Sequence, residues 1–229
     1  MTAATVTQHY TTEERARQSL GGSEHAIYEM VGATLARRQL KGETLVDVGC
    51  GTGHLRSFVR SCCERYLGVD VVRYEGFPAD AEFFRVDLDS GQAPFPDHSA
   101  ELVVSVETIE HLENPRAFMR ELTRLAKPGG WVVITTPNQL SLLSLLTLLI
   151  KRRFSAFQDV HYPAHITALL EVDLLRIAAE CGLREVELAY SLNGRVIFTP
   201  WHYPKFLART FPRVLSDNLL LIGRKPLVI

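Results

Sequence analysis

The feature that most restricts the fold of this chain is an apolar stretch that leads directly into a glycine-rich turn. Thr44–Val48 has the composition of a buried strand, and Gly49-Cys50-Gly51-Thr52-Gly53 follows it. Glycine has no Cβ, so such a turn can bend sharply and let a ligand approach the backbone closely. A helical pattern begins straight after the turn. This order predicts an open α/β sheet that binds a ligand at the carboxyl end of its first strand.

The rest of the chain continues this alternation of strand and helix patterns. Strands are predicted at Thr44–Val48, Tyr66–Val69, Glu82–Val86, Leu102–Val106, Trp131–Thr135, Val186–Tyr190 and Asn218–Gly223. Helices are predicted at His54–Arg65, Pro115–Ala126 and Glu171–Cys181. The alternation indicates a mostly parallel sheet with helices on both faces. Because no clear helix separates the last two strands, one of them is expected to enter as an antiparallel edge strand.

We expect residues 1–40 to form an arm and lid helices ahead of a single domain over residues 41–229. The first residues of the chain are polar. Apolar spacing predicts two helices between Thr12 and Leu40, separated by Gly21-Gly22, with Ser23 capping the second. These helices, with side chains such as Tyr28, are expected to close over the ligand pocket and shield it from water.

Charge and cysteine content argue against several classes of function. The chain carries 25 basic and 26 acidic residues, a formal net charge of −1, so no overall basic field attracts it to nucleic acid. Its four cysteines show no zinc-binding spacing, and reduced thiols are expected. The N-terminus lacks the pattern of a secretory signal, so a cytoplasmic protein is expected.

Three carboxylates follow three successive predicted strands. Asp47 stands just ahead of the glycine turn, where it would repel a pyrophosphate but suits a cationic ammonium and sulfonium. Asp70 can accept hydrogen bonds from both ribose hydroxyls of a nucleoside. Asp87 can accept from an adenine amino group, and Leu88 would pack against the base. Together these positions favour S-adenosylmethionine over a nicotinamide dinucleotide.

The motif Val46–Gly53, with Gly68-Val69-Asp70 and Lys127-Pro128-Gly129-Gly130, resembles the class I S-adenosylmethionine-dependent methyltransferases. The resemblance implies a Rossmann-like, seven-stranded sheet whose last strand is antiparallel. It also implies a cofactor site formed by Asp47, Gly49, Cys50, Gly51, Gly53, Asp70, Val71, Asp87, Leu88 and Val106.

A second group of polar residues follows the fourth predicted strand. If a helical turn begins there, Glu107, Glu110 and His111 share one face at positions i, i+3 and i+4. Such a group could bind a divalent cation or perform acid–base chemistry. The alternative is a capped helix start whose histidine packs beneath the cofactor.

Glu107-x-x-Glu110-His111 with a distant His161 or His165 is similar to two families, the ubiquinone-biosynthesis O-methyltransferases and the small-RNA terminal 2′-O-methyltransferases. The resemblance implies that Glu107, Glu110, His111 and His165 or His161 hold a divalent metal such as Mg²⁺ against the acceptor oxygen. Thr136-Pro137-Asn138 and His165-Ile166 resemble a broad bacterial group of tailoring methyltransferases.

Without a metal, a neutral histidine is a suitable general base for a hydroxyl acceptor. The catalytic candidates are the histidines His165 and His111, together with the carboxylate of Glu107. O-methylation of a hydroxylated small molecule is the expected reaction. The alternatives are 2′-O-methylation of an RNA 3′ end, N-methylation of a small metabolite, and a non-catalytic cofactor-binding module.

The leucine-rich run Leu140–Ile150 is followed by the basic cluster Lys151-Arg152-Arg153. This run is shorter than the roughly 20 residues that a membrane-spanning helix needs. It is expected to form a helix over the sheet that covers the acceptor pocket. Residues 140–154 could instead make a peripheral membrane contact or a dimer contact.

Overall fold

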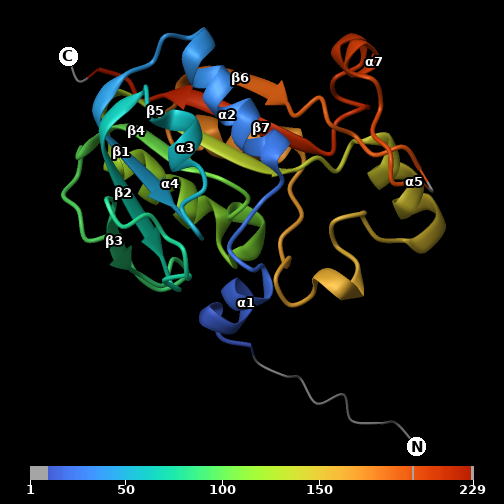
Figure 1. The fold of residues 1–229 in the computed structure, drawn as a ribbon, viewed down its shortest axis with the longest axis horizontal. Helices are drawn as coiled ribbons and strands as arrows, with labels where there is room; N and C mark the ends of the chain where they lie inside the picture. The colour runs from blue at the N-terminus through green and yellow to red at the C-terminus, as the bar shows by residue number, and fades with distance from the viewer. Residues whose placement is uncertain (1–9, 198, 228–229) are drawn as a thin grey trace, which may run out of the picture.

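The computed structural model describes residues 10–197 and 199–227, and its sheet contains seven strands in the order β3-β2-β1-β4-β5-β7-β6 (Figure 1). β7 runs antiparallel to both of its neighbours and lies one position in from the edge strand β6. The other pairings are parallel. The predicted sheet is therefore confirmed, with bounds β1 Gly42–Val48, β2 Cys63–Asp70, β3 Glu82–Arg85, β4 Ala100–Ser105, β5 Ala126–Pro137, β6 Arg184–Tyr190 and β7 Asn218–Arg224.

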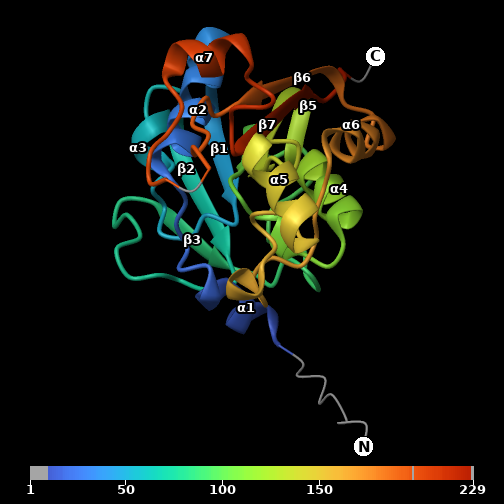
Figure 2. The same ribbon diagram turned by 90° about the vertical axis from the view of Figure 1, so that its right-hand side faces the viewer.

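Helices cover both faces of the sheet (Figures 1 and 2). α2 (His25–Arg37) and α3 (Arg56–Val59) pack on one face, whereas α4 (Pro115–Leu125) and α6 (Glu171–Glu180) pack on the other. Successive side chains of a strand point to opposite faces. Accordingly, Leu45 of β1 packs in the core beneath α2, and the next residue, Val46, packs in the core beneath α4.

Two local predictions were wrong. The helix predicted at His54–Arg65 is helical only over Arg56–Val59, because Cys63 pairs with Gly42 and begins β2. Strand pairing with β1 thus overrides the local helical pattern. The N-cap of α2 is Glu24 rather than Ser23, whose backbone N–H donates to the Tyr28 hydroxyl at 3.0 Å.

The remaining elements lie at or beyond the carboxyl ends of the parallel strands. They are α1 (Thr12–Gln18), the short 3₁₀ turns η1 (Ile109–His111) and η2 (Asp159–His161), α5 (Leu142–Lys151) and α7 (Lys205–Thr210). The predicted arm falls mainly on residues 1–9, which lie outside the described part of the chain. α1 lies at the opposite end of the molecule from α7 (Figures 1 and 2).

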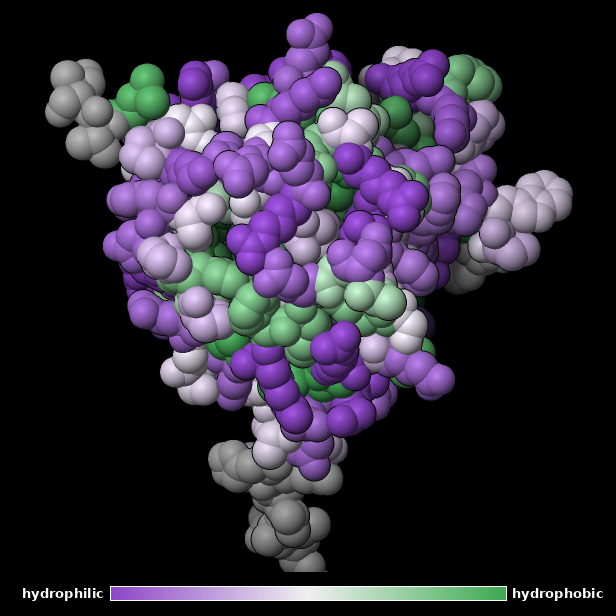
Figure 3. All heavy atoms as spheres, turned by 60° about the vertical axis from the view of Figure 1, so that its left-hand side comes forward, coloured by the Kyte–Doolittle hydropathy of each residue, from purple (hydrophilic) through white to green (hydrophobic). Residues whose placement is uncertain are grey.

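The leucine-rich helix α5 does not cover the sheet as predicted. Its one buried side chain among the described residues is Ser144, whereas Leu149 and Ile150 are 78% and 67% exposed. The opposite side of the molecule, on the left in Figure 1, is mostly hydrophilic, with a band of hydrophobic residues across it (Figure 3). Across the described residues, no helix combines the length and apolarity needed to cross a membrane.

Candidate active site

A cavity of about 550 Å³ lies at the carboxyl ends of the parallel strands, where ligands bind in open α/β sheets. Its walls come from α1, the segment between α1 and α2, the glycine turn, and the loops after β2, β4 and β5. We call the part beside β1 and β2 the cofactor half; it includes Gly49, Gly51, Asp70 and Val71. The part beside β4 and β5 is the acceptor half, lined by Glu107, His111, His161, His165 and Arg195.

The glycine turn is locked against the segment that joins α1 to α2. Gly49 and Gly51 have positive φ angles of 79° and 51°, a conformation that favours glycine. A Cβ on Gly51 would lie 2.1 Å from the Gly21 carbonyl oxygen, and the next residue, Thr52, donates its N–H to that oxygen at 2.8 Å. The N-terminal segment therefore forms part of the cavity wall.

Asp70 holds the glycine turn in place from the end of β2. Its carboxylate accepts hydrogen bonds from the N–H groups of Gly51, at 2.9 Å, and Val72, at 3.1 Å. Burial raises the pKa of Asp70, and these backbone hydrogen bonds oppose the rise. The carboxylate is thus fixed at the floor of the cofactor half.

Asp47 offers a second carboxylate, with one oxygen free to interact with a cation. The Tyr66 hydroxyl donates to Oδ2, whereas Oδ1 is buried and has no hydrogen-bond partner among the described residues. Burial raises the pKa of Asp47 to about 7. A buried, unpartnered carboxylate oxygen beside a glycine turn fits a ligand that carries an ammonium and a sulfonium, such as S-adenosylmethionine.

Eight of the ten residues predicted to bind the cofactor line the cavity: Asp47, Gly49, Cys50, Gly51, Asp70, Val71, Leu88 and Val106. Gly53 and Asp87 are not among the described lining residues. A Cβ on Gly53 would instead meet Pro78 and Phe77. The Asp87 carboxylate accepts from the backbone N–H of Asp89 at 3.0 Å, so it shapes the loop after β3.

The sequence patterns missed Arg15 and Tyr74, which also line the cavity. Arg15 is nearly buried and forms ion pairs with Asp89 and, at 3.2 Å, with Glu113. The Tyr74 hydroxyl donates to the Ala16 carbonyl. These contacts join α1 to loops distant in sequence, so the helical spacing of α1 could not reveal them.

Glu107 marks the boundary between the two halves. It adopts a positive φ of 48°, and its backbone N–H donates to Thr135 Oγ1 at 3.0 Å. Asn218 Nδ2 donates to its Oε2 at 2.8 Å, while the buried Oε1 has no partner in the described part of the chain. Burial raises the pKa of Glu107 to about 8, so the carboxyl group is mostly protonated at neutral pH.

His111 and His165 meet in the acceptor half, with ring centroids 4.8 Å apart. Nδ1 of His111 lies 2.9 Å from the Ala164 carbonyl oxygen, and Nδ1 of His165 lies 2.7 Å from that of Ala156. Because a carbonyl only accepts hydrogen bonds, each Nδ1 carries a proton and each Nε2 keeps a lone pair. Burial lowers the pKa of His111 to about 4 and also lowers that of His165, so both rings are neutral at pH 7.

Glu110, His111 and His165 bring one ligand-type atom each to within 4.8 Å of one another. Glu110 Oε2 accepts from Thr136 Oγ1 at 3.2 Å, and the other oxygen has no partner among residues that the structure describes. Burial raises the pKa of Glu110. Histidines held by backbone carbonyls, next to an unpartnered carboxylate, fit a divalent cation. Glu107 and His161, which stacks on His165, lie outside this three-residue cluster.

Comparison with known proteins agrees with this geometry. Residues 24–188 match the family described as the methyltransferase domain. The chain belongs to this methyltransferase family. The match and the relatives below identify the chain as a member of the class I S-adenosylmethionine-dependent methyltransferase family.

Three similar proteins illustrate the relationship. A probable S-adenosylmethionine-dependent methyltransferase of Mycolicibacterium smegmatis is 32% identical over 117 residues, which cover 50% of this chain and 45% of that protein. This methyltransferase chain therefore spans less than half the length of that relative. The ubiquinone biosynthesis O-methyltransferase of Burkholderia pseudomallei is 28% identical over 67% of this chain and 69% of its own length. The crystal structure of a methyltransferase from Archaeoglobus fulgidus shares the fold, with a TM-score of 0.63, 20% identity and coverage of 91% of this chain and 97% of that one.

We expect Asp70→Asn to weaken binding of the product S-adenosylhomocysteine by about tenfold or more, because it removes a charged acceptor at the cavity floor. Asp87→Asn is the matched control, since Asp87 does not line the cavity and should leave the affinity nearly unchanged. Isothermal titration calorimetry measures both. Equal losses in the two variants would contradict the different positions of these carboxylates.

Glu107→Gln should change how stability depends on pH. Glutamate has an ordinary pKa of 4.5, whereas folded Glu107 has a pKa of about 8, so the stability contributed by its protonated form is lost as pH rises between these values. The free energy of unfolding of Glu107→Gln, relative to wild type, should therefore increase with pH in this window, by up to about 1.4 kcal/mol per pH unit. Urea denaturation with a chelator present tests this. A constant difference would contradict a buried neutral carboxyl group.

Proposed function

We propose that this methyltransferase transfers its methyl group to a hydroxyl oxygen of a small-molecule acceptor. The observation that carries the proposal is the pair of neutral histidines, His111 and His165, whose Nδ1 protons point to backbone carbonyls. This arrangement leaves two imidazole lone pairs in the acceptor half of the cavity. A relative that covers 67% of this chain is an O-methyltransferase by name, which also supports the proposal.

The cofactor half would hold S-adenosylmethionine through groups with distinct tasks. Asp70 would accept hydrogen bonds from the ribose, Leu88 and Val106 would pack against the base, and Asp47 would face the cationic end. Bound S-adenosylmethionine supplies an activated methyl group and a neutral thioether leaving group. α1 and the segment after it would act as a lid that excludes water, held by the ion pairs of Arg15.

In the acceptor half, His165 would act as general base. Its Nε2 accepts the proton of the acceptor hydroxyl as the oxygen forms a bond to the methyl carbon. The electron pair of the broken carbon–sulfur bond stays on sulfur. Glu107, which is protonated near neutral pH, can donate a hydrogen bond that orients the acceptor. The depressed pKa of His165 keeps its ring neutral and ready to accept a proton.

A second version of this chemistry uses a metal. Glu110, His111 and His165, with Glu107 nearby, would hold a divalent cation, which supplies Lewis acidity toward the acceptor hydroxyl. Two imidazole ligands favour a transition metal over Mg²⁺, and among the transition metals Mn²⁺ also suits the carboxylate of Glu110. The same Nε2 atoms cannot accept protons while they bind a cation, so metal binding separates the two versions.

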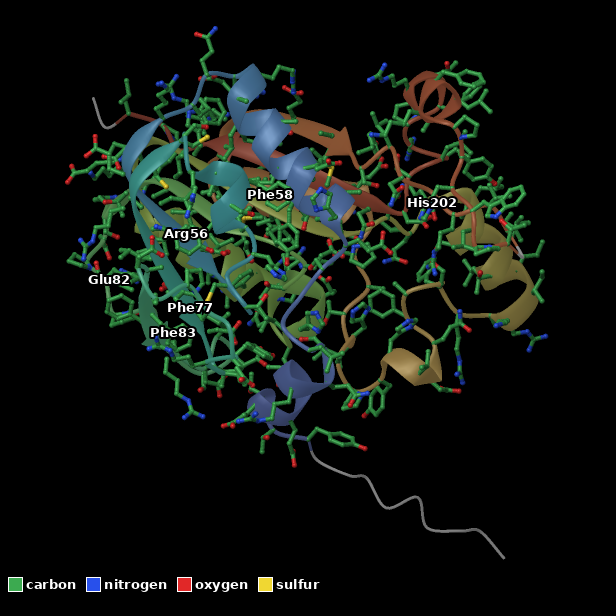
Figure 4. All side chains as sticks on the ribbon, in the orientation of Figure 1. Arg56, Phe58, Phe77, Glu82, Phe83 and His202 are labelled. Carbon is green, nitrogen blue, oxygen red and sulfur yellow. The ribbon has the colours of Figure 1, made fainter. Side chains whose placement is uncertain are left out.

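His165→Ala should reduce turnover of a hydroxylated acceptor by about 10²- to 10⁴-fold, the usual contribution of a general base. The same variant should bind S-adenosylhomocysteine with little change, because His165 belongs to the acceptor half. His202→Ala is the matched control, since His202 is exposed on the loop before α7, away from the glycine turn (Figure 4). Turnover is measured as release of S-adenosylhomocysteine with a panel of phenols and sugars. Full activity of His165→Ala would remove this residue from the mechanism.

If the metal version holds, the purified chain should bind about one Mn²⁺ per molecule. The electron paramagnetic resonance signal of free Mn²⁺ would fall on addition of protein. Glu110→Gln should abolish this effect, whereas Glu113→Gln, on an exposed carboxylate outside the cluster, should preserve it. An unchanged signal with the wild-type chain, together with turnover that resists chelator, would leave the histidine base as the mechanism.

A further inference from the structure

α5 and the segment around α7 expose large apolar side chains on one side of the molecule. On α5, Leu149 is 78% exposed and Ile150 is 67% exposed. On the other segment, Trp201 and Phe206 are 74% and 68% exposed. We call this region the α5–α7 surface; its exposed apolar residues are Leu145, Leu148, Leu149, Ile150, Trp201, Phe206, Leu207, Phe211 and Val214.

The orientation of α5 is the reverse of that expected for a helix on a globular core, which normally buries its apolar side. Ser141 caps the helix and accepts from the Ser144 N–H at 3.2 Å. The buried Ser144 hydroxyl donates to Gln139 Oε1 and accepts from the Ser155 N–H, both at 3.3 Å. These hydrogen bonds hold Ser144 inward, while Leu145, Leu148 and Leu149 are exposed.

The two segments contact each other where α5 begins. The backbone N–H of Leu142, at the start of α5, donates to the Val214 carbonyl at 2.8 Å. Asn138, just ahead of α5, donates through Nδ2 to the Arg213 carbonyl at 2.7 Å. α5 and α7 accordingly lie on the same side of the molecule, away from α1, α3 and β3 (Figures 1 and 2).

This surface is basic although the whole chain is nearly neutral. Residues 140–154 and 199–214 contain six basic residues and no acidic one, whereas the chain has a net charge of −1. Arg153 pairs with Asp159 and Arg213 pairs with Glu171, which lie outside these segments. The other four are the exposed Lys151, Arg152, Lys205 and Arg209. An apolar surface flanked by cations matches the two components of an anionic lipid bilayer, its acyl chains and its headgroups.

The α5–α7 surface also borders the acceptor half of the cavity. His161 and Arg195 line the cavity and also line a shallow groove that contains Leu143 and Thr147 of α5. Val160, which lines the cavity, is 74% exposed. A surface that rests on a bilayer here would bring the cavity mouth next to the lipid.

We propose that the α5–α7 surface docks onto anionic lipid bilayers, with its apolar side chains in the interface and its basic residues on the headgroups. This docking proposal does not depend on which reaction the protein catalyses. Its consequence, that the hydroxylated acceptor reaches the cavity from the bilayer, rests on the proposed function.

Vesicle flotation with the full chain tests the docking. The protein should float with phosphatidylcholine vesicles that contain about 30% phosphatidylglycerol, and much less with phosphatidylcholine alone. Leu149→Glu/Ile150→Glu and Lys151→Glu/Lys205→Glu should each weaken binding to the anionic vesicles by about tenfold or more. Val172→Glu/Leu175→Glu is the matched control on α6, where these two residues are 43% and 40% exposed, and it should float like wild type.

The surface variants should bind S-adenosylhomocysteine in calorimetry as tightly as wild type does. This result would show that they fold and that a loss of flotation reflects loss of docking rather than loss of the active site. Absence of flotation with anionic vesicles would overturn the proposal. So would an equal loss in the α6 control. A dimer that light scattering detects in wild type and not in Leu149→Glu/Ile150→Glu, without flotation, would assign the surface to a second copy of the chain and also overturn it.

Discussion

Parallel pairing of β1 with both β2 and β4 is the constraint on which the whole site depends. In this register Asp47 lies opposite Gly68 on one side and Val104 on the other, so the three strands end at the same edge. The turn after β1 then donates the N–H groups of Gly49 and Cys50 to the Val69 carbonyl, at 2.7 and 3.1 Å. A shift of this register would separate the glycine turn from the carboxylate of Asp70, and no change in the loops could restore the contact.

Several buried carboxyl groups with an unpartnered oxygen lie at the carboxyl edge of these strands. Asp47, Glu107 and Glu110 each keep one buried oxygen without a partner among the described residues. Burial alone opposes ionisation, so without a cationic ligand these groups hold protons at higher pH than free carboxylates do. A positively charged ligand would reverse that balance. The site is therefore better suited to cations than to the phosphates that other glycine turns bind.

The sheet could be predicted from the sequence because its strands are short apolar runs bounded by glycine and polar residues. The positions of Asp47 and Asp70 at the cavity could also be predicted, since both residues follow such runs directly. The spacing of apolar residues failed to predict local structure where contacts with residues distant in the sequence determine it. Strand pairing shortened α3, and a buried ion pair with Asp89 holds Arg15 in the cavity wall. Hydrogen bonds of Ser144 hold the polar side of α5 inward and leave Leu149 exposed. None of these contacts leaves a periodic signal in the sequence.

α1 and α5 lie beside the cavity and come from different parts of the chain. α1 and the segment after it line the cavity, and the groove beside α5 meets the acceptor half at His161 and Arg195. A water-soluble nucleoside and an apolar acceptor have opposite preferences for solvent and lipid. Under the proposed docking, lipid would lie against α5 and leave α1 in water. The nucleoside would then enter from water and the apolar acceptor from the bilayer. α1 could open to exchange the nucleoside while the protein stays on the bilayer.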